Sequence, residues 1–394
     1  MPVTAPKASR PSVPYPPVLH SLTSLRFFAA AWVLLFHFKE FFPGTTLQSA
    51  SAARLGYLGV DFFFVLSGFV LALVYMPKID DSRFDYWSFL VRRVARIYPL
   101  HILTLVVTLG LSLIGLQLGW DFTVWNMADW QKRETGEILR ALFTHLTLIH
   151  AWGSTNGLLF NLPSWSISAE WFAYLLFPVF IIACARLISR PIALVVFCSV
   201  ALVALDMANT IATGHSLLKA TWNIGALRII PTFALGIALH RLGQAHSLGP
   251  RGSLLAFLIA LVVLTGLVAF ETSEVMIALC LAAIVFLAAD AERNGHLKQL
   301  CNPFPVLLGE VSYGVYLWHF PLGILAFDVV LARRGDVGSG TALVLIAAVI
   351  AAITAVSWAS YKLFEVPARS AIVSAGNALG TPSHFTPRTP PKDD

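Results

Sequence analysis

Long apolar runs dominate this chain and constrain its fold more than any other feature. Of its 394 residues, 57% are hydrophobic and only 12% are charged, whereas a soluble domain carries about 25% charged residues. Many of the runs hold roughly 18 to 23 residues, which is enough for a helix to cross about 30 Å of hydrocarbon. We therefore expect an all-α fold, a polytopic transmembrane helical bundle of about ten spans.

Hydropathy and loop charge together predict the topology. The expected spans are 22–42, 57–77, 97–117, 168–188, 192–210, 224–242, 253–270, 274–291, 308–330 and 341–364. With the N-terminus in the cytoplasm, 17 Lys and Arg residues fall on inner segments, 9 on outer segments and one, Arg26, within the first span. Cytoplasmic loops carry an excess of Lys and Arg, so we expect an inner-membrane protein with both termini in the cytoplasm.

The segments between and beyond the spans leave no room for a second folded domain. We expect a disordered cytoplasmic tail at 1–20, one membrane domain at 21–365 and a largely disordered cytoplasmic tail at 366–394. The longest connection, 119–167, would lie outside. Its apolar stretch at 138–152 is too short for a span and is expected to be interfacial or re-entrant.

Composition argues against two classes of function. The net charge of +6 comes from 27 basic and 21 acidic residues. In a membrane protein this excess is loop charge that sets orientation, so we expect no nucleic-acid partner. The four cysteines show neither metal-ligand nor disulfide spacing, and we expect packing roles for them and no metal.

Ionisable residues inside the first two spans call for a functional explanation, because each costs about 2.5–3.5 kcal/mol to insert. Arg26 and His37 are eleven positions apart, about three helical turns, and so share one face about 16 Å apart along the axis. Asp61, near the outer end of the second span, lies at a depth similar to His37. A His–Asp pair would fix the imidazole tautomer. The alternatives are a snorkelling arginine, an interfacial histidine and a carboxylate satisfied by backbone.

Two arginines mark the inner edge of the third span. Arg93 and Arg96 are three residues apart and share a face, with Arg92 beside them. Guanidinium groups pair with phosphate oxygens in a fork geometry, so the pair suits a phosphate-bearing ligand. The alternative is an ordinary positive-inside cluster.

Two later segments supply further candidates. The stretch LPSWSISAEWFAYLLFP places Glu170 near the start of a helix, at the level of His37 and Asp61, and also contains Trp165 and Ser166. In the ninth span, three polar residues at successive three-residue steps lie along one stripe. That stripe is either packed interior or the lining of a polar cavity, and its members are Tyr313, Tyr316 and His319.

Together these residues resemble the acyltransferase 3 family, integral-membrane O-acyltransferases of bacterial surface polysaccharides and some secondary metabolites. The resemblance covers about residues 20–365. It is carried by the pattern Arg26-x10-His37, GVDFFFVLSGF at 59–69, Arg93-x-x-Arg96, WSISAE at 165–170 and SYGVYLWHFP at 312–321. Several such motifs in the right order are far more specific than any one alone.

The resemblance implies an acyl-CoA donor, usually acetyl-CoA, with His37 catalytic and the arginines serving CoA binding or catalysis. Some members carry an extracytoplasmic esterase-like domain. We expect none here, so either the chain transfers directly to a carbohydrate or glycolipid acceptor, or a separate periplasmic transferase completes the step.

The predicted mechanism follows from the stacking order of these residues. Phosphates would bind Arg93 and Arg96, and His37, oriented by Asp61 or Glu170, would remove the proton of an acceptor hydroxyl. An acyl-histidine intermediate is the alternative route. Arg26 would stabilise developing negative charge or bind the donor. The acceptor would contact the residues of the two later segments, namely Trp165, Ser166, Tyr313, Tyr316 and His319.

Two alternatives stay open at this stage. Five tryptophans of the outer connection can stack on sugar rings or anchor the chain at the membrane interface, and these are Trp120, Trp125, Trp130, Trp152 and Trp165. The competing function is a transporter that exports a sugar or lipid through the same intramembrane charges. It predicts inverted repeats, which the sequence does not show.

Overall fold

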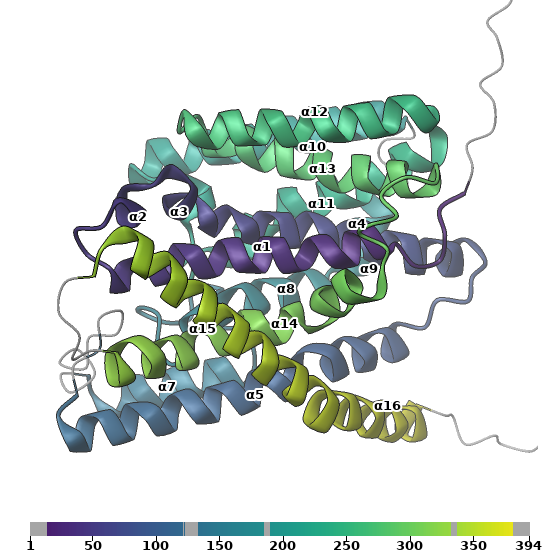
Figure 1. The fold of residues 1–394 in the computed structure, drawn as a ribbon. Helices are drawn as coiled ribbons and strands as arrows, with labels where there is room; N and C mark the ends of the chain where they lie inside the picture. The colour runs from purple at the N-terminus through teal and green to yellow at the C-terminus, as the bar shows by residue number, and fades with distance from the viewer. Residues whose placement is uncertain (1–13, 121, 123–132, 185–189, 332–336, 381–394) are drawn as a thin grey trace, which may run out of the picture.

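The computed structural model describes residues 14–120, 122, 133–184, 190–331 and 337–380. Within them, nine helices are long and apolar enough to cross a membrane, which confirms the expected all-α polytopic bundle (Figure 1). These are built on α1 (His20–Phe38), α4 (Gly59–Asp80), α5 (Tyr86–Leu118), α10 (Pro191–Thr213), α11 (Gly225–Ala245), α12 (Gly249–Ala269), α13 (Glu274–Arg293), α14 (Pro303–Ile324) and α15 (Ser339–Ser360).

Shorter elements connect or extend the long helices. The α-helical ones are α2 (Thr46–Ser49), α3 (Ser51–Arg54), α7 (Thr135–Leu146), α8 (Trp165–Leu175), α9 (Phe177–Ile182) and α16 (Val366–Gly380). The 3-10 turns are η1 (Lys39–Phe41), η2 (Gly56–Leu58), η3 (Leu162–Ser164) and η5 (Leu217–Lys219), and η6 (Leu325–Val330) and η7 (Tyr361–Glu365) are π-helical.

The predicted span at 168–188 is the one that the nine long helices do not include. The segment is divided into α8, of 11 residues, and α9, of 6 residues, with a break at Leu176. Pro178 follows the break and cannot donate a helical N–H. Residues 185–189 lie outside the described part of the chain.

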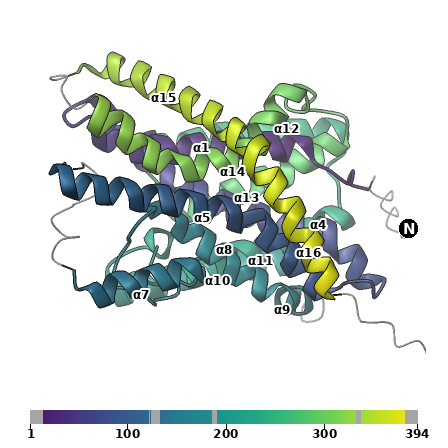
Figure 2. The same cartoon turned by 90° about the horizontal axis from the view of Figure 1, so that it is seen from below.

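Two further expectations concern shorter segments. The stretch predicted as interfacial or re-entrant overlaps α7, whose 12 residues are too few for a span. The predicted disorder over 366–394 is wrong for Val366–Gly380, which forms α16, while 381–394 lie outside the described residues. Packing stabilises α16: the Trp87 indole donates to the Gly376 carbonyl at 3.1 Å, so α16 lies against α5 (Figure 2).

The bundle has a packed interior and a lipid-facing periphery. Helix α4 packs along α11, and α1 packs along α14. Helix α12 contributes only Ser253, Phe257 and Ala260 to the buried interior, and it lies at one edge of the bundle (Figure 1). Its remaining apolar surface is what a helix in contact with lipid requires.

Two glycines allow α4 and α11 to approach closely. A Cβ atom at Gly68 would lie 2.1 Å from the Phe233 carbonyl oxygen, and one at Gly236 would lie 2.0 Å from the Val65 carbonyl oxygen. Small residues at membrane helix crossings let the backbones meet in this way.

We expect Gly236→Val to separate these helices and lower the unfolding free energy by about 1–3 kcal/mol, the usual cost of overpacking. Thermal unfolding in detergent measures the change. Gly266→Val is the matched control, because a Cβ atom at Gly266 in α12 meets nothing within 4 Å. Equal melting temperatures for the two variants would contradict this account of the crossing.

The N-terminal end of α1 is held firmly at one end of the bundle. The Glu292 carboxylate on α13 accepts hydrogen bonds from the backbone N–H of His20 at 2.9 Å and of Ser21 at 2.8 Å. A carboxylate at a helix N-terminus satisfies otherwise unpaired donors and complements the helix dipole. This anchor fixes the residues that precede α1, which line the cavity described next.

Candidate functional site

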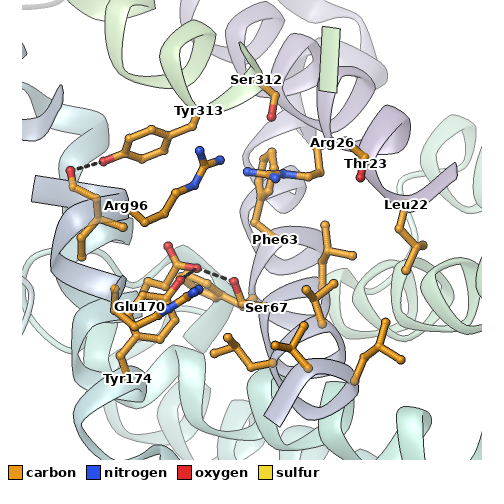
Figure 3. Close-up of a pocket in the computed structure, with 18 of the residues that line it drawn as sticks. Leu22, Thr23, Arg26, Phe63, Ser67, Arg96, Glu170, Tyr174, Ser312 and Tyr313 are labelled. Atoms are coloured by element: carbon orange, nitrogen blue, oxygen red, sulfur yellow. Dashed lines mark hydrogen bonds between the residues drawn. The ribbon is translucent and has the colours of Figure 1, made fainter. Parts of the chain in front are cut away.

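A cavity of about 290 Å³ lies between α1, α4, α5, α8 and α14. Its polar lining consists of Thr23, Arg26, Ser67, Arg93, Arg96, Ser166, Glu170, Tyr174, Ser312, Tyr313 and Tyr316 (Figure 3). The rest of the lining is apolar, and it includes Pro17, Val18 and Leu19 just before or at the start of α1. We call this space the arginine cavity.

Three guanidinium groups face the arginine cavity without a carboxylate partner. Arg26 and Arg96 extend into it from opposite sides (Figure 3), and neither makes a hydrogen bond or ion pair with a described residue. Arg96 lies 5.4 Å from the centre of the Tyr313 ring. Arg93 lies 5.6 Å from the centre of the Tyr174 ring, and its Nε is buried and unpaired. These arginines are half-buried, and cations shielded from water without a partner are costly, so the cavity is suited to an anionic ligand.

Glu170 belongs to the arginine cavity rather than to the level of His37 and Asp61, so that part of the prediction is wrong. Its Oε1 accepts hydrogen bonds from the Ser67 hydroxyl and, at 2.5 Å, from the Tyr174 hydroxyl. The physical reason is that α8 begins at Trp165 inside the bundle, where Trp165 is only 7% exposed. Glu170 therefore lies deeper than a helix starting at the outer surface would place it.

A second cavity, of about 310 Å³, contains the predicted catalytic histidine. Its lining consists of His37, Phe38, Glu40, Phe41, Leu162, His319 and Phe320, and we call it the histidine cavity. The Nδ1 atom of His37 lies 3.2 Å from Nε2 of His319 and 3.1 Å from the Val33 carbonyl oxygen. The structure thus brings together two of the predicted residues, from the first and ninth spans.

Arg26 and His37 line different cavities, although both lie on α1 as predicted. The two cavities share no lining residue. Tyr316 lines the arginine cavity and His319, one turn further along α14, lines the histidine cavity. The Tyr316 hydroxyl lies 2.7 Å from the Ser166 Oγ and 3.0 Å from the Pro163 carbonyl oxygen, so it forms part of the wall between them.

Asp61 does not orient His37, which corrects the predicted pairing. Its carboxylate accepts two hydrogen bonds from Arg228 on α11, from Nε at 3.2 Å and from Nη2 at 2.6 Å. Both side chains are buried, with exposures of 0% and 1%. Arg228 also donates to the Ala220 carbonyl at 3.1 Å. The sequence contained a usable signal, because Arg228 is an ionisable residue within the predicted span 224–242.

Trp165, which was expected to contact the acceptor, lines neither of the two cavities. It is buried, with the Arg228 guanidinium 5.0 Å from its ring centre. It therefore supports the ion pair by a cation–π contact. Of the other tryptophans considered, Trp125 and Trp130 lie outside the described residues.

The remaining predicted residues have structural partners. The Tyr313 hydroxyl donates to the Ile97 carbonyl at 2.6 Å, which ties α14 to α5. Ser166, besides its contact with Tyr316, lies 3.1 Å from the Pro163 carbonyl oxygen. Ser166, Tyr313 and Tyr316 line the arginine cavity, and His319 lines the histidine cavity. The ninth-span stripe is therefore cavity lining at all three of its positions.

A group of histidines was missed in the sequence. His101, His145 and His150 are buried, and their rings lie within 7° of parallel. His150 Nε2 lies 3.1 Å from the Ser164 hydroxyl. Within the described part of the chain, no group of His, Cys, Asp and Glu side chains has the arrangement of a metal site. No sequence motif links the three, so only folding brings them together.

Comparisons with known proteins agree with this architecture. The family model described as an acyltransferase domain matches residues 19–362. Acyltransferase MdmB of Streptomyces mycarofaciens is 28% identical, over 83% of this chain and 86% of the relative. The putative peptidoglycan O-acetyltransferase YrhL of Bacillus subtilis is 26% identical, over 78% of this chain and 49% of the relative.

A third relative is also named as a peptidoglycan O-acetyltransferase. The peptidoglycan O-acetyltransferase OatA of Listeria monocytogenes is 21% identical, over 89% of this chain and 55% of the relative. The chain thus spans most of the length of MdmB but only about half of the two peptidoglycan O-acetyltransferases. No solved structure matches the chain significantly.

Proposed function

Because the chain belongs to the acyltransferase 3 family, we propose that it moves an acyl group from acyl-CoA to a hydroxyl of an extracytoplasmic or lipid-linked polysaccharide or glycoconjugate. The family makes it a multi-pass membrane O-acyltransferase, and the choice of donor and acceptor is the proposal. The observation that carries it is the placement of three unpaired arginines in one cavity and the catalytic histidine candidate in the neighbouring one.

The arginine cavity suits the donor. Its apolar lining matches the neutral arm of CoA, and Arg93 and Arg96 would pair with phosphate oxygens by charge-assisted hydrogen bonds. Pro17 and Val18, which precede α1, border the cavity at the end of the bundle that we place on the cytoplasmic side of a bacterial inner membrane. Acyl-CoA is made in the cytoplasm, so the donor would enter from this end.

The histidine cavity suits the acceptor. It lies toward the opposite end of α1, beyond the wall formed by Tyr316 and Ser166. In the proposed orientation that end faces the periplasm, where a polysaccharide or lipid-linked sugar would bind directly or through a separate transferase. The acyl carbon of the donor must pass this wall to reach His37, and we expect a small group, acetyl, to pass most readily.

The proposed chemistry uses His37 as a general base. As the acceptor oxygen attacks the thioester carbonyl carbon, its proton moves to His37 and a C–O bond forms. The tetrahedral intermediate then collapses, the C–S bond breaks, and the departing CoA sulfur takes the proton from His37. Arg26 is positioned in the donor cavity to interact with donor charge.

The direct test is transfer of a labelled acetyl group from acetyl-CoA by the purified protein in nanodiscs. Support would be labelled product on an added glycan or glycolipid acceptor, with free CoA released in equal amount. In sealed proteoliposomes, movement of the sugar or lipid across the bilayer without any acylation would replace this proposal with a transporter.

We expect Arg96→Gln to raise the KM for acyl-CoA by about 10- to 100-fold, since a hydrogen bond to a charged group contributes about 1.5–3 kcal/mol. Arg92→Gln is the matched control, because Arg92 is exposed and does not line the cavity, yet its loss removes the same charge. Steady-state kinetics at varied acetyl-CoA measures both. A similar KM in the two variants would mean that Arg96 does not bind the donor.

A further inference from the structure

We infer that His319 positions His37 and fixes its tautomer, in the role that a carboxylate has in a Ser-His-Asp triad. This rests on the proposed function, because it concerns the partner of the proposed base. The two imidazole rings come from α1 and α14 and have their centres 4.9 Å apart. His319 is 1% exposed, so its orientation is set by the protein around it.

The proton on His319 is placed by its own helix. The Nδ1 atom of His319 lies within hydrogen-bond distance of the Tyr316 carbonyl oxygen. A carbonyl oxygen can only accept a hydrogen bond, so Nδ1 carries the hydrogen. In a neutral imidazole the other nitrogen then has a free lone pair, and on His319 that nitrogen is Nε2.

The position of the proton on His37 follows from two acceptors that face the same atom. The Val33 carbonyl oxygen lies 3.1 Å from Nδ1 of His37, and the lone pair of His319 Nε2 lies 3.2 Å from it. Nδ1 must therefore be the protonated nitrogen and donate to them. The Nε2 atom of His37 keeps its lone pair, and this is the nitrogen able to take a proton from an acceptor hydroxyl.

Asp61 and Glu170, the two carboxylates that the sequence offered for this role, have other partners. Asp61 pairs with Arg228, and Glu170 is held by Ser67 and Tyr174 in the other cavity.

Glu40, which lines the histidine cavity, forms an ion pair with Lys39. Within the described part of the chain, the hydrogen bonds of His37 go to Val33 and His319.

A neutral imidazole partner also avoids placing an unpaired negative charge among aromatic rings such as Phe38, whose centre is 6.1 Å from that of His319. When His37 gains its second proton, the His319 lone pair stabilises the imidazolium.

The test compares three substitutions of His319 by kinetics. The amide oxygen of His319→Gln can reach the place of Nε2, whereas that of His319→Asn is one bond shorter. We expect kcat to fall about 10²-fold in His319→Leu and His319→Asn, part of the 10²–10⁴-fold that a positioned base contributes. We expect His319→Gln to recover at least about tenfold of this loss, with the KM for acetyl-CoA unchanged in all three.

A second readout does not depend on activity. Solid-state NMR of the full-length protein with ¹⁵N-labelled histidine in nanodiscs reports which nitrogen of His37 carries the hydrogen. We expect the Nδ1–H tautomer in the wild type and a mixture of tautomers in His319→Leu. Equal losses of kcat in the Gln and Asn variants, or wild-type kcat in His319→Leu, would overturn the inference, as would an Nε2–H tautomer in the wild type. Failure of the proposed function would differ, because the wild type itself would then transfer no acyl group.

Discussion

His37→Ala is expected to reduce kcat for acyl transfer by about 10²–10⁴-fold, the usual contribution of a general base. The affinity for acyl-CoA should change little, because His37 lines the histidine cavity and the donor would occupy the arginine cavity. The variant therefore separates donor binding from chemistry. Its phenotype is the opposite of that expected for Arg96→Gln, which raises KM.

Measuring this requires turnover and binding on the same preparation. Acetyl transfer gives kcat, and equilibrium binding of a non-hydrolysable acetyl-CoA analogue gives the donor affinity. His215→Ala is the matched control, because His215 is exposed and lines neither cavity. If His37→Ala turned over at the wild-type rate, His37 would not be the base and the acceptor would have to be activated elsewhere.

Asp61→Asn is expected to destabilise the folded protein by about 3–5 kcal/mol, because it leaves the Arg228 cation buried without its counter-charge. The loss should extend to activity. Arg228 lies over Trp165 at the start of α8, and α8 carries Ser166 and Glu170 into the arginine cavity. Without the Asp61 carboxylate, the Arg228 guanidinium would move to another hydrogen-bond acceptor, and this movement would displace α8.

A double substitution distinguishes a buried charge from a general packing defect. Asp61→Leu with Arg228→Met removes both charges, and such replacements are often neutral or stabilising, so the double variant should be more stable than Asp61→Asn. Glu271→Gln is the control for an exposed pair, since Glu271 pairs with Arg54 at exposures of 41% and 48%, and it should cost about 0–1 kcal/mol. Unfolding in mixed detergent measures the stability of Asp61→Asn, of the double variant and of Glu271→Gln. A double variant as unstable as Asp61→Asn would argue against the ion-pair explanation.

The positions of the helices were predictable from the sequence where they depended only on the length of an apolar run. The apolar runs predicted nine of the long helices, because a bilayer requires about 20 apolar residues whatever their partners are. At 168–188 the helix is interrupted at Leu176, which separates α8 from α9, and hydropathy averages over such a break. Hydropathy also missed α16, whose helix is stabilised by contact with α5.

The candidate site was predictable as a set of residues but not as a set of pairs. Intramembrane charge alone singled out Arg26, His37 and Asp61, because each ionisable group in a span is costly and needs a reason. Depth along the helix then suggested that Asp61 would partner His37. Depth is only one coordinate, however, and the rotation and packing of α4 turn Asp61 toward α11 and Arg228.

The sequence by itself determined that the chain crosses a membrane as helices, where the costly polar residues lie along it, and which family it resembles. Only the tertiary structure decided that Arg26 and His37 face separate cavities, that Arg228 neutralises Asp61, and that His319 contacts His37. The physical reason is the difference in range between the interactions that insert a helix and those that form a site. Insertion into lipid depends on the composition of each segment alone, whereas hydrogen bonds and ion pairs act over about 3 Å between residues as far apart in sequence as His37 and His319.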